Sequence, residues 1–219
     1  MAYRDFSWDA LEEQFGVTNE LTLLFSDVRP VAPSDYLNMA LAISHDLPLR
    51  NEKAKSELII APILADLVNR NRDFFTLYSG EMLTADREQG LVGEIDFFVA
   101  KRTRTITINF PILAVVEAKK NDFDLGRPQC AAQLLGAQRL NARRGYQLPL
   151  YGCVTTATEW QFFRLADNHF QFDNRTYQLN RLDELLGVFQ RILDQYRQLL
   201  TELGFAAEEP LPTYEVLWT

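Results

Sequence analysis

The stretch Ile112-Leu113-Ala114-Val115-Val116-Glu117-Ala118-Lys119 decides both the fold and the candidate site of this chain. Its first five residues are apolar, which is typical of a central strand buried on both faces of a sheet. Side chains alternate along a strand, so Glu117 and Lys119 share one face while Val116 and Ala118 point to the other. The sequence therefore predicts a buried strand that ends in a carboxylate and an ammonium group at the rim of a sheet.

Helices and strands are expected to alternate on either side of this strand. Residues 84–93 are expected to form a polar loop. The order of the elements predicts an α/β protein with a mixed central sheet and helices on both faces. In chain order the expected elements are an amphipathic helix and loop within 8–25, an irregular region to 50, a helix over 52–70 bent by Pro62, strands at 74–78, 95–99, 105–108 and 112–116, a helix over 128–143, strands at 150–155, 160–165 and 169–172, and a helix over 182–203.

Length and composition are typical of one globular domain. The chain has 219 residues, 47% apolar and 24% charged, and a chain of this size buries roughly 70% of its unfolded surface. The longest apolar stretch, 110–116, is far shorter than the ~20 residues that span a bilayer. The acidic N-terminus lacks the basic start of a signal peptide, and Cys130 and Cys153 form no CxxC pair. We therefore expect a cytoplasmic protein with reduced thiols and no membrane association.

Charge is distributed unevenly along the chain. The net charge is −8, from 30 acidic and 22 basic residues, which argues against a non-specific binder of polyanions. The segment 101–144 nevertheless holds nine basic residues and only three acidic ones. Such a segment is either a chance cluster on a solvated face or a local surface for an anion, and composition alone leaves both interpretations open.

A second acidic residue is expected to join Glu117. Asp96 follows Gly93-Glu94-Ile95 at the start of the earlier strand, and it converges on Glu117 if the two strands are neighbours. Two carboxylates and a main-chain carbonyl form an oxygen-rich site suited to Mg²⁺ or Mn²⁺. Lys119 beside such an ion would orient or deprotonate a water, or stabilise charge on a phosphoryl oxygen. The alternative is a strand-end ion pair of Glu117 with Lys119, and Asp96 as an ordinary strand residue.

Gly93-Glu94-Ile95-Asp96 and Glu117-Ala118-Lys119 together resemble the motifs of the PD-(D/E)xK nuclease superfamily, which has the restriction-endonuclease-like fold. Gly-x-x-Asp replaces the Pro-Asp of that family, which is a common relaxed form. Three further features fit: a glutamate on the helix before the sheet, glutamines on the helix after Glu-x-Lys, and a strand pair similar to that of the N-terminal nuclease domains of type I restriction subunits. These are Glu57 within Ser56-Glu57-Leu58, Gln129 with Gln133, and Tyr151–Thr155 followed by Glu159–Phe162.

The resemblance covers about 53–165 and implies a three-layer α/β/α core within one domain of 219 residues. Residues 1–50 would be a helical and irregular N-terminal appendage, and 182–203 a C-terminal helix. The implied activity is Mg²⁺- or Mn²⁺-dependent endonuclease cleavage, the hydrolysis of phosphodiester bonds in DNA or, less often, RNA.

The resemblance also implies a role for each site residue. Asp96, Glu117 and the Ala118 carbonyl would hold the cation, and Lys119 would polarise the attacking water. Glu57 would be a third acid, either a ligand through water or a positioning group. Gln129 and Gln133 would face the site from the following helix. The alternatives are an exposed helix-start acid favoured by the helix dipole for Glu57, and ordinary solvent-facing polarity for the glutamines.

The basic segment gains a role from the same resemblance. Five of its side chains would surround the acidic pocket and neutralise phosphates, and Gln133 would join them in contacting nucleic acid. Two other functions compete with a nuclease: a catalytically silent domain that binds nucleic acid or a protein, and a scaffold with a structural ion network. A homodimer would suit cleavage of both strands of a duplex. The five basic residues of segment 101–144 that would surround the acidic pocket are Lys120, Arg127, Arg139, Arg143 and Arg144.

Overall fold

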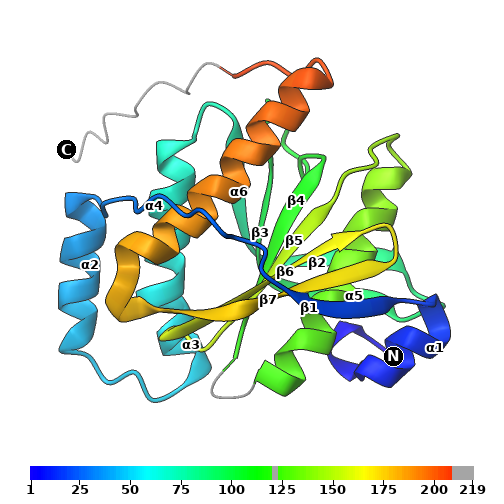
Figure 1. Cartoon of the computed structure of the whole chain (residues 1–219), viewed down its shortest axis with the longest axis horizontal. Helices are drawn as coiled ribbons and strands as arrows, with labels where there is room; N and C mark the ends of the chain where they lie inside the picture. Colours follow the sequence, from blue (N-terminus) through cyan, green and yellow to red (C-terminus); the bar gives the residue numbers. More distant parts are fainter. Residues whose placement is uncertain (120–122, 209–219) are drawn as a thin grey trace.

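The computed structural model describes residues 1–119 and 123–208, which form an α/β structure around a seven-stranded mixed sheet (Figure 1). The strand order is β1-β7-β6-β5-β4-β3-β2. The pairs β1–β7 and β4–β5 are parallel, and the other pairs are antiparallel. The strands are β1 (Thr18–Thr22), β2 (Phe75–Asp86), β3 (Leu91–Lys101), β4 (Ile112–Ala118), β5 (Leu150–Thr155), β6 (Glu159–Ala166) and β7 (His169–Gln178). The helical segments are η1 (Tyr3–Asp5), α1 (Trp8–Phe15), α2 (Asp35–His45), α3 (Glu52–Lys55), η2 (Ser56–Ile60), α4 (Ala61–Arg70), α5 (Phe123–Ala142), η3 (Leu179–Arg181) and α6 (Leu182–Glu202).

Strand β4 is the central strand that the sequence predicts. It lies between antiparallel β3 and parallel β5, and all seven of its residues are buried. Val116 is paired with Phe97 of β3 and with Cys153 of β5. Because β4 is covered on both faces and paired on both edges, its functional groups can reach solvent only at its end, where Glu117–Lys119 lie.

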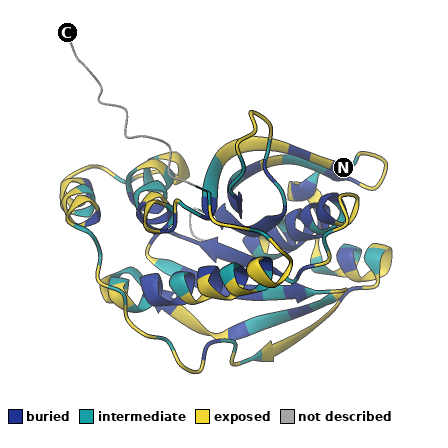
Figure 2. Ribbon diagram, turned by 90° about the horizontal axis from the view of Figure 1, so that it is seen from above, coloured by how far each residue is buried: buried dark blue, intermediate teal, exposed yellow. Residues whose placement is uncertain are grey.

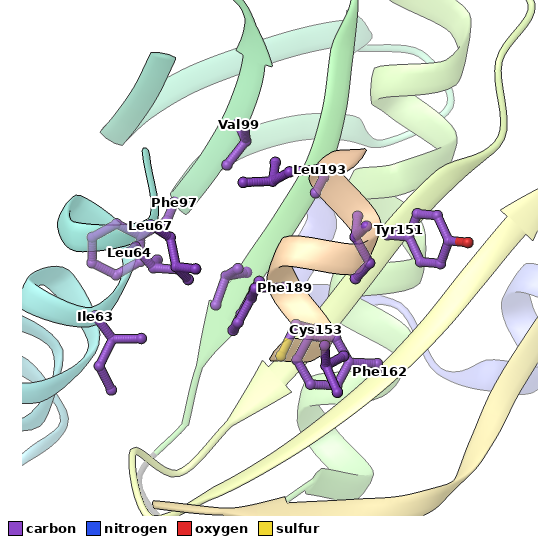
Figure 3. Packing of buried hydrophobic residues seen from close by; sticks show 14 of the residues in the cluster. Ile63, Leu64, Leu67, Phe97, Val99, Tyr151, Cys153, Phe162, Phe189 and Leu193 are labelled. Carbon is purple, nitrogen blue, oxygen red and sulfur yellow. The ribbon is translucent and has the colours of Figure 1, made fainter. Parts of the chain in front are cut away.

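Helices cover both faces of the sheet, as expected. The neighbouring residues Val115 and Val116 belong to two different buried clusters. The cluster of Val116 joins the sheet to α4 and α6 (Figure 3), and the cluster of Val115 joins it to α5 and the N-terminal residues. The buried residues line the sheet and the helix sides that face it (Figure 2). Within 1–119 and 123–208, no helix is long and apolar enough to cross a membrane.

The helix expected over 52–70 is interrupted, and Pro62 explains where. Asn51 begins it by accepting a hydrogen bond from the N–H of Ala54 (2.8 Å), and the π-helical segment η2 separates α3 from α4. Pro62 has no N–H to offer the carbonyl four residues earlier, that of Leu58. The hydroxyl of Ser44 in α2 donates to that carbonyl instead (2.6 Å). Helix α2 therefore supports the segment that faces the candidate site.

The N-terminal 50 residues contribute more regular structure than the sequence indicates. Strand β1 adds an edge to the sheet beside β7, and α2 is capped at its N-terminus by Ser34, whose hydroxyl accepts from the N–H of Leu37 (3.2 Å). The expectation of an irregular region up to 50 was wrong for this helix. The loop expected after the first helix, within 8–25, was also wrong in part, because it contains β1. This strand is mostly exposed and therefore lacks the apolar alternation of a half-buried strand.

The prediction of a strand at 105–108 was also wrong. This segment is mostly exposed and contains no strand, and Ile106 is fully exposed. Its alternating pattern has no neighbouring strand to pair with. The hairpin of β2 and β3 is instead longer than expected, since its pairing runs from Phe75–Lys101 to Asp86–Leu91. Residues 84–93, expected to be a loop, thus contain the ends of both strands.

The N-terminal segment is inserted between the sheet and α5 through Tyr3. Its ring packs against Gly93, where an added Cβ would lie 3.1 Å from a ring carbon, and its hydroxyl lies directly against Gly136 of α5. Tyr3 is only 1% exposed, so the ring has little freedom to move away from any larger side chain at position 136.

Gly136→Ala should therefore destabilise the protein, although the same change at an exposed helical site stabilises by about 1 kcal/mol. Overpacking of this kind costs about 1–3 kcal/mol, so we expect the melting temperature to fall by several degrees. Adding Tyr3→Phe should recover part of the loss, because it removes the atom nearest to the new methyl group. A melting temperature that rises in the single variant would contradict this packing.

Candidate active site

The candidate site forms where the pairing of β3 with β4 ends. The last regular pair in that direction is Phe97 with Val116. The next N–H along β4 on this side, that of Ala118, donates to Oδ2 of Asp96 (2.8 Å) rather than to a main-chain carbonyl. This hydrogen bond confirms that Asp96 meets the end of β4. Because the N–H and C=O of a strand residue point toward the same neighbour, the Ala118 carbonyl is directed to the Asp96 side as well.

A local irregularity of the β2–β3 hairpin turns Asp96 toward β4. Ile95 and Phe98 lie in the same buried cluster, on the α5 face, although they are three residues apart. Regular alternation would put them on opposite faces, so the strand changes face between them, at Asp96. Gly80, in the facing part of β2, has φ +69°, a left-handed conformation that glycine adopts without strain. The sequence holds no periodic signal for this feature.

Glu117 is buried between the sheet and α5. It is 1% exposed. Its Oε1 accepts a hydrogen bond from Nζ of Lys119 (2.6 Å), and its Oε2 accepts one from Nε2 of Gln133 (2.7 Å). The predicted pairing of Glu117 and Lys119 on one face is confirmed. Gln133 is itself fully buried, so it holds Glu117 in place, and the expectation that it contacts nucleic acid was wrong.

Lys119 connects the end of β4 to the first turns of α5. Its Nζ also donates to Oε1 of Gln129 (3.0 Å), and its side chain is 17% exposed. Helix α5 approaches closely here, because a Cβ at Gly126 would lie 2.9 Å from Cγ of Lys119 and 2.5 Å from Val154. Gly126 is thus a site-forming residue that motif spacing does not reveal.

Burial and mutual charge shift the pKa values of Asp96, Glu117 and Lys119. Burial raises the pKa of Glu117 to about 7, and the charge of Asp96 adds to the effect. Burial also raises the pKa of Asp96, against the opposing influence of the Ala118 N–H and of Lys119. Burial alone would lower the pKa of Lys119, but the carboxylate of Glu117 outweighs it and the pKa lies above its usual value. Lys119 is therefore an ammonium ion, able to donate hydrogen bonds and not to accept a proton.

Asp96 borders an open cleft that carries several acidic side chains. The cleft has a volume of about 410 Å³ and lies between β3, the end of β4 and the α3–η2 segment. Glu52, Glu57 and Glu94 line it together with Asp96. Excess negative charge in a cleft raises the local concentration of cations, so the approach to Asp96 favours a metal ion over a free phosphate.

Asp96 and Glu117 suit a hard divalent cation. The carboxylate oxygens have lone pairs beyond the hydrogen bonds that they accept, and burial raises the pKa of both groups, an effect that an added positive charge would oppose. Two carboxylates and the Ala118 carbonyl give an oxygen donor set of the kind that Mg²⁺ and Mn²⁺ prefer. Among the residues described, no group of three or more His, Cys, Asp or Glu side chains is arranged to hold a metal ion.

Two acids of the preceding helical segment, Glu52 and Glu57, line the cleft. The Glu57 side chain is 63% exposed and forms an ion pair with Lys53 (3.8 Å) at the rim of the cleft. Glu52, in the first turn of α3, instead acts electrostatically on both Asp96 and Lys119, raising the pKa of each. The two residues are five positions apart, and both are exposed at the cleft.

The basic residues do not surround the pocket as expected. Arg127 lies on α5 near the site, where it contacts Asp124 and Gln161. Arg139 follows Gln129 by about 15 Å along the helix, at ~1.5 Å per residue, and pairs with Asp86 (3.2 Å). The expected encirclement was wrong because it ignored the length of α5. Arg143 and Arg144 are farther still, at the exposed end of the helix, and Lys120 lies outside the described residues.

The raised pKa of Glu117 predicts how stability depends on pH. Between the ordinary value of 4.5 and about 7, the folded protein holds a proton that the unfolded chain releases, so the free energy of unfolding falls as pH rises through this window. In chelator-treated protein, Glu117→Gln should remove most of this decline, on the order of 1–3 kcal/mol between pH 5 and 8.

Thermal melting at several pH values measures this effect. Glu88→Gln changes an exposed glutamate in the β2–β3 turn and is the matched control. Parallel pH profiles for the wild type and Glu117→Gln would show that Glu117 does not titrate in this window.

Comparisons with known proteins add no relationship to these observations. No family model matches the chain, and no curated protein matches it either. The similarity to PD-(D/E)xK nucleases therefore rests on residues of this chain: Asp96, the Glu117-Ala118-Lys119 segment, and the glutamines Gln129 and Gln133.

Proposed function

We propose that this protein is a Mg²⁺- or Mn²⁺-dependent nuclease that hydrolyses phosphodiester bonds of nucleic acid, with DNA as the favoured substrate. The observation that carries the proposal is the arrangement of Asp96, Glu117 and Lys119 at the end of one buried strand. Two desolvated carboxylates with raised pKa values lie beside an ammonium group, and one of them borders an open acidic cleft. A divalent cation would complete the charge balance.

Asp96, Glu117 and the Ala118 carbonyl would hold the cation. When bound, Mg²⁺ supplies Lewis acidity and lowers the pKa of a coordinated water. Lys119 donates to Glu117 and Gln129, which engages two of its three N–H donors within the described residues. The third is suited to a water or a phosphoryl oxygen, where its fixed positive charge would stabilise the negative charge that develops during hydrolysis. Gln129 orients this ammonium group, and Gln133 fixes the carboxylate that holds it.

The architecture around these residues supports the restriction-endonuclease-like form of the fold. A helical segment precedes the antiparallel strands β2, β3 and β4, and α5 then leads to β5, which is parallel to β4. The glutamines that the resemblance places after Glu-x-Lys lie on α5 and contact the site directly. This arrangement gives Asp96, Glu117, Lys119 and the two glutamines contacts consistent with their proposed roles, whereas Glu57 forms an ion pair only with Lys53 among the residues described.

A structural ion network is the main alternative among the functions considered. In such a network Glu117 and Lys119 would form a buried pair, and Asp96 would serve only to accept the Ala118 N–H. The presence of Asp96 raises the pKa of Glu117 further, which weakens such a network, because like charges in a desolvated site oppose each other. A catalytically silent binding domain likewise gains nothing from two opposed carboxylates. Both alternatives predict indifference to divalent cations.

Two variants test the proposal together. Lys119→Ala should reduce Mn²⁺-dependent cleavage of DNA by at least about 100-fold, the usual cost of removing a group that stabilises developing charge. Asp96→Asn keeps an acceptor for the Ala118 N–H but loses its charge, so it should lose cleavage and also the rise in melting temperature on adding Mn²⁺. For the wild type that rise corresponds to about 2.7 kcal/mol at a hundredfold excess over the dissociation constant.

Lys53→Ala, at the rim of the same cleft, is the control and should retain activity. Cleavage by both site variants at the wild-type rate would exclude the mechanism. A melting temperature of the wild type that does not respond to Mn²⁺ would contradict the proposed cation site and agree with both alternatives.

A further inference from the structure

A second concave site lies on the α5 face of the sheet, beyond the first turns of α5. It has a volume of about 490 Å³ and is formed by α1, β1, β6, β7 and the start of α5. This size is within the range of pockets that bind small organic groups. Its aromatic wall is made by Trp8 and Phe172, whose ring centroids are 5.4 Å apart. Leu21, 74% exposed, adds apolar surface at its open side.

The strand register places this pocket beside the candidate active site. Glu117 is paired with Val154 of β5, and Val154 is paired with Gln161 of β6. Paired residues of neighbouring strands point to the same face, so Glu117 and Gln161 share the α5 face, two strands apart. At about 4.8 Å per strand the separation is roughly 10 Å. Gly126 of α5 lies over Val154, between the carboxylates and the pocket.

The charged groups that line the pocket are three acids and one arginine, a net charge of −2, and each has a hydrogen-bond partner within the fold. Arg127 donates to Asp124 (2.6 Å) and to Gln161 (2.7 Å). Asp173 accepts a hydrogen bond from the hydroxyl of Tyr177 (2.9 Å). Glu20 accepts from Gln171 (2.8 Å). A phosphate would therefore find no excess positive charge here, and a neutral ligand is favoured.

The remaining polar groups of the pocket are amides and a hydroxyl. Asn19 and Asn174 are exposed beside the aromatic wall, and Thr176 lies next to Gln161 across the β6–β7 pair. Amide and hydroxyl side chains both donate and accept hydrogen bonds, as the edge of a nucleobase does. An aromatic wall combined with such groups is the chemistry by which proteins hold single bases, through stacking and edge contacts.

We propose that this pocket holds an unpaired nucleobase of the strand whose phosphate lies at Asp96 and Glu117, and hence that the substrate is single-stranded beside the cleavage point. This inference rests on the proposed nuclease function. A base inside a duplex is stacked and paired and cannot enter a pocket of this kind, whereas a base about two nucleotides from the scissile phosphate of a single strand can span the roughly 10 to 14 Å given by two strand spacings from Glu117 and three from Asp96.

Binding of a fluorescein-labelled 12-nucleotide single-stranded DNA, measured by anisotropy, tests the inference. The measurements use Lys119→Ala protein with Mg²⁺, so that the DNA stays uncut. Trp8→Ala should weaken binding of the single strand about five- to hundredfold, the usual effect of removing one stacked aromatic. The same DNA as a duplex should bind with unchanged affinity.

Trp8 also packs on Phe170 and Phe172, so a second variant separates ligand contact from folding. Leu21→Glu places a negative charge at the exposed side of the pocket and should also weaken binding of the single strand at least fivefold. Met39→Glu, 66% exposed on α2, has the same net charge away from the pocket and should change binding less than twofold.

The possible results separate this inference from the nuclease proposal. Wild-type cleavage of DNA combined with unchanged single-strand binding in Trp8→Ala and Leu21→Glu would overturn the pocket assignment and leave the nuclease in place. Selective loss of single-strand binding in both variants would support the pocket even if the wild type does not cleave. Failure of the Lys119→Ala protein to bind the single strand at all would overturn the pocket assignment.

Discussion

The ion pair between Glu117 and Lys119 under α5 is the interaction on which the rest of the site depends. Burial of a carboxylate is costly unless a charge and hydrogen-bond donors compensate it. Lys119 and Gln133 supply this compensation at 2.6 and 2.7 Å, and Gly126 allows α5 to come close enough for both contacts. Asp96 then adds a second negative charge that the fold leaves only partly balanced. The site is stable enough to form and remains short of positive charge.

The α5 helix has two neighbours of different character at its first turns. On one side are Glu117 and Lys119, and on the other is an aromatic pocket whose charged lining is net acidic. The register of β4, β5 and β6 fixes the spacing between them. An acidic cleft repels a phosphate until a cation is bound, which makes binding of nucleic acid depend on the metal. A contact that relies on stacking avoids this repulsion, so the pocket would contribute affinity where the local charge does not.

The sequence predicted what local patterns determine. Burial and alternation located β4 and the shared face of Glu117 and Lys119, since both follow from neighbours in the chain. Asp96 meets the end of β4 as predicted, because β3 and β4 are neighbours, but it lies in the middle of β3 and not at the start of its strand. Glu52 did not stand out beside Glu57, because the sequence alone does not show that both acids line the same cleft. The arginines were misplaced because their separation along a 20-residue helix, about 30 Å long, does not appear in a charge count.

The titration of the Glu117 carboxyl group tests the central claim most directly. Its ¹³Cδ chemical shift can be followed by NMR as a function of pH in protein freed of metal and again with saturating Mg²⁺, with Glu117→Gln to assign the signal. We expect a midpoint near 7 without metal and a midpoint well below the ordinary glutamate value with Mg²⁺, because a bound cation favours the ionised form. A midpoint near 4.5 in the metal-free protein, or one that Mg²⁺ does not move, would contradict the account.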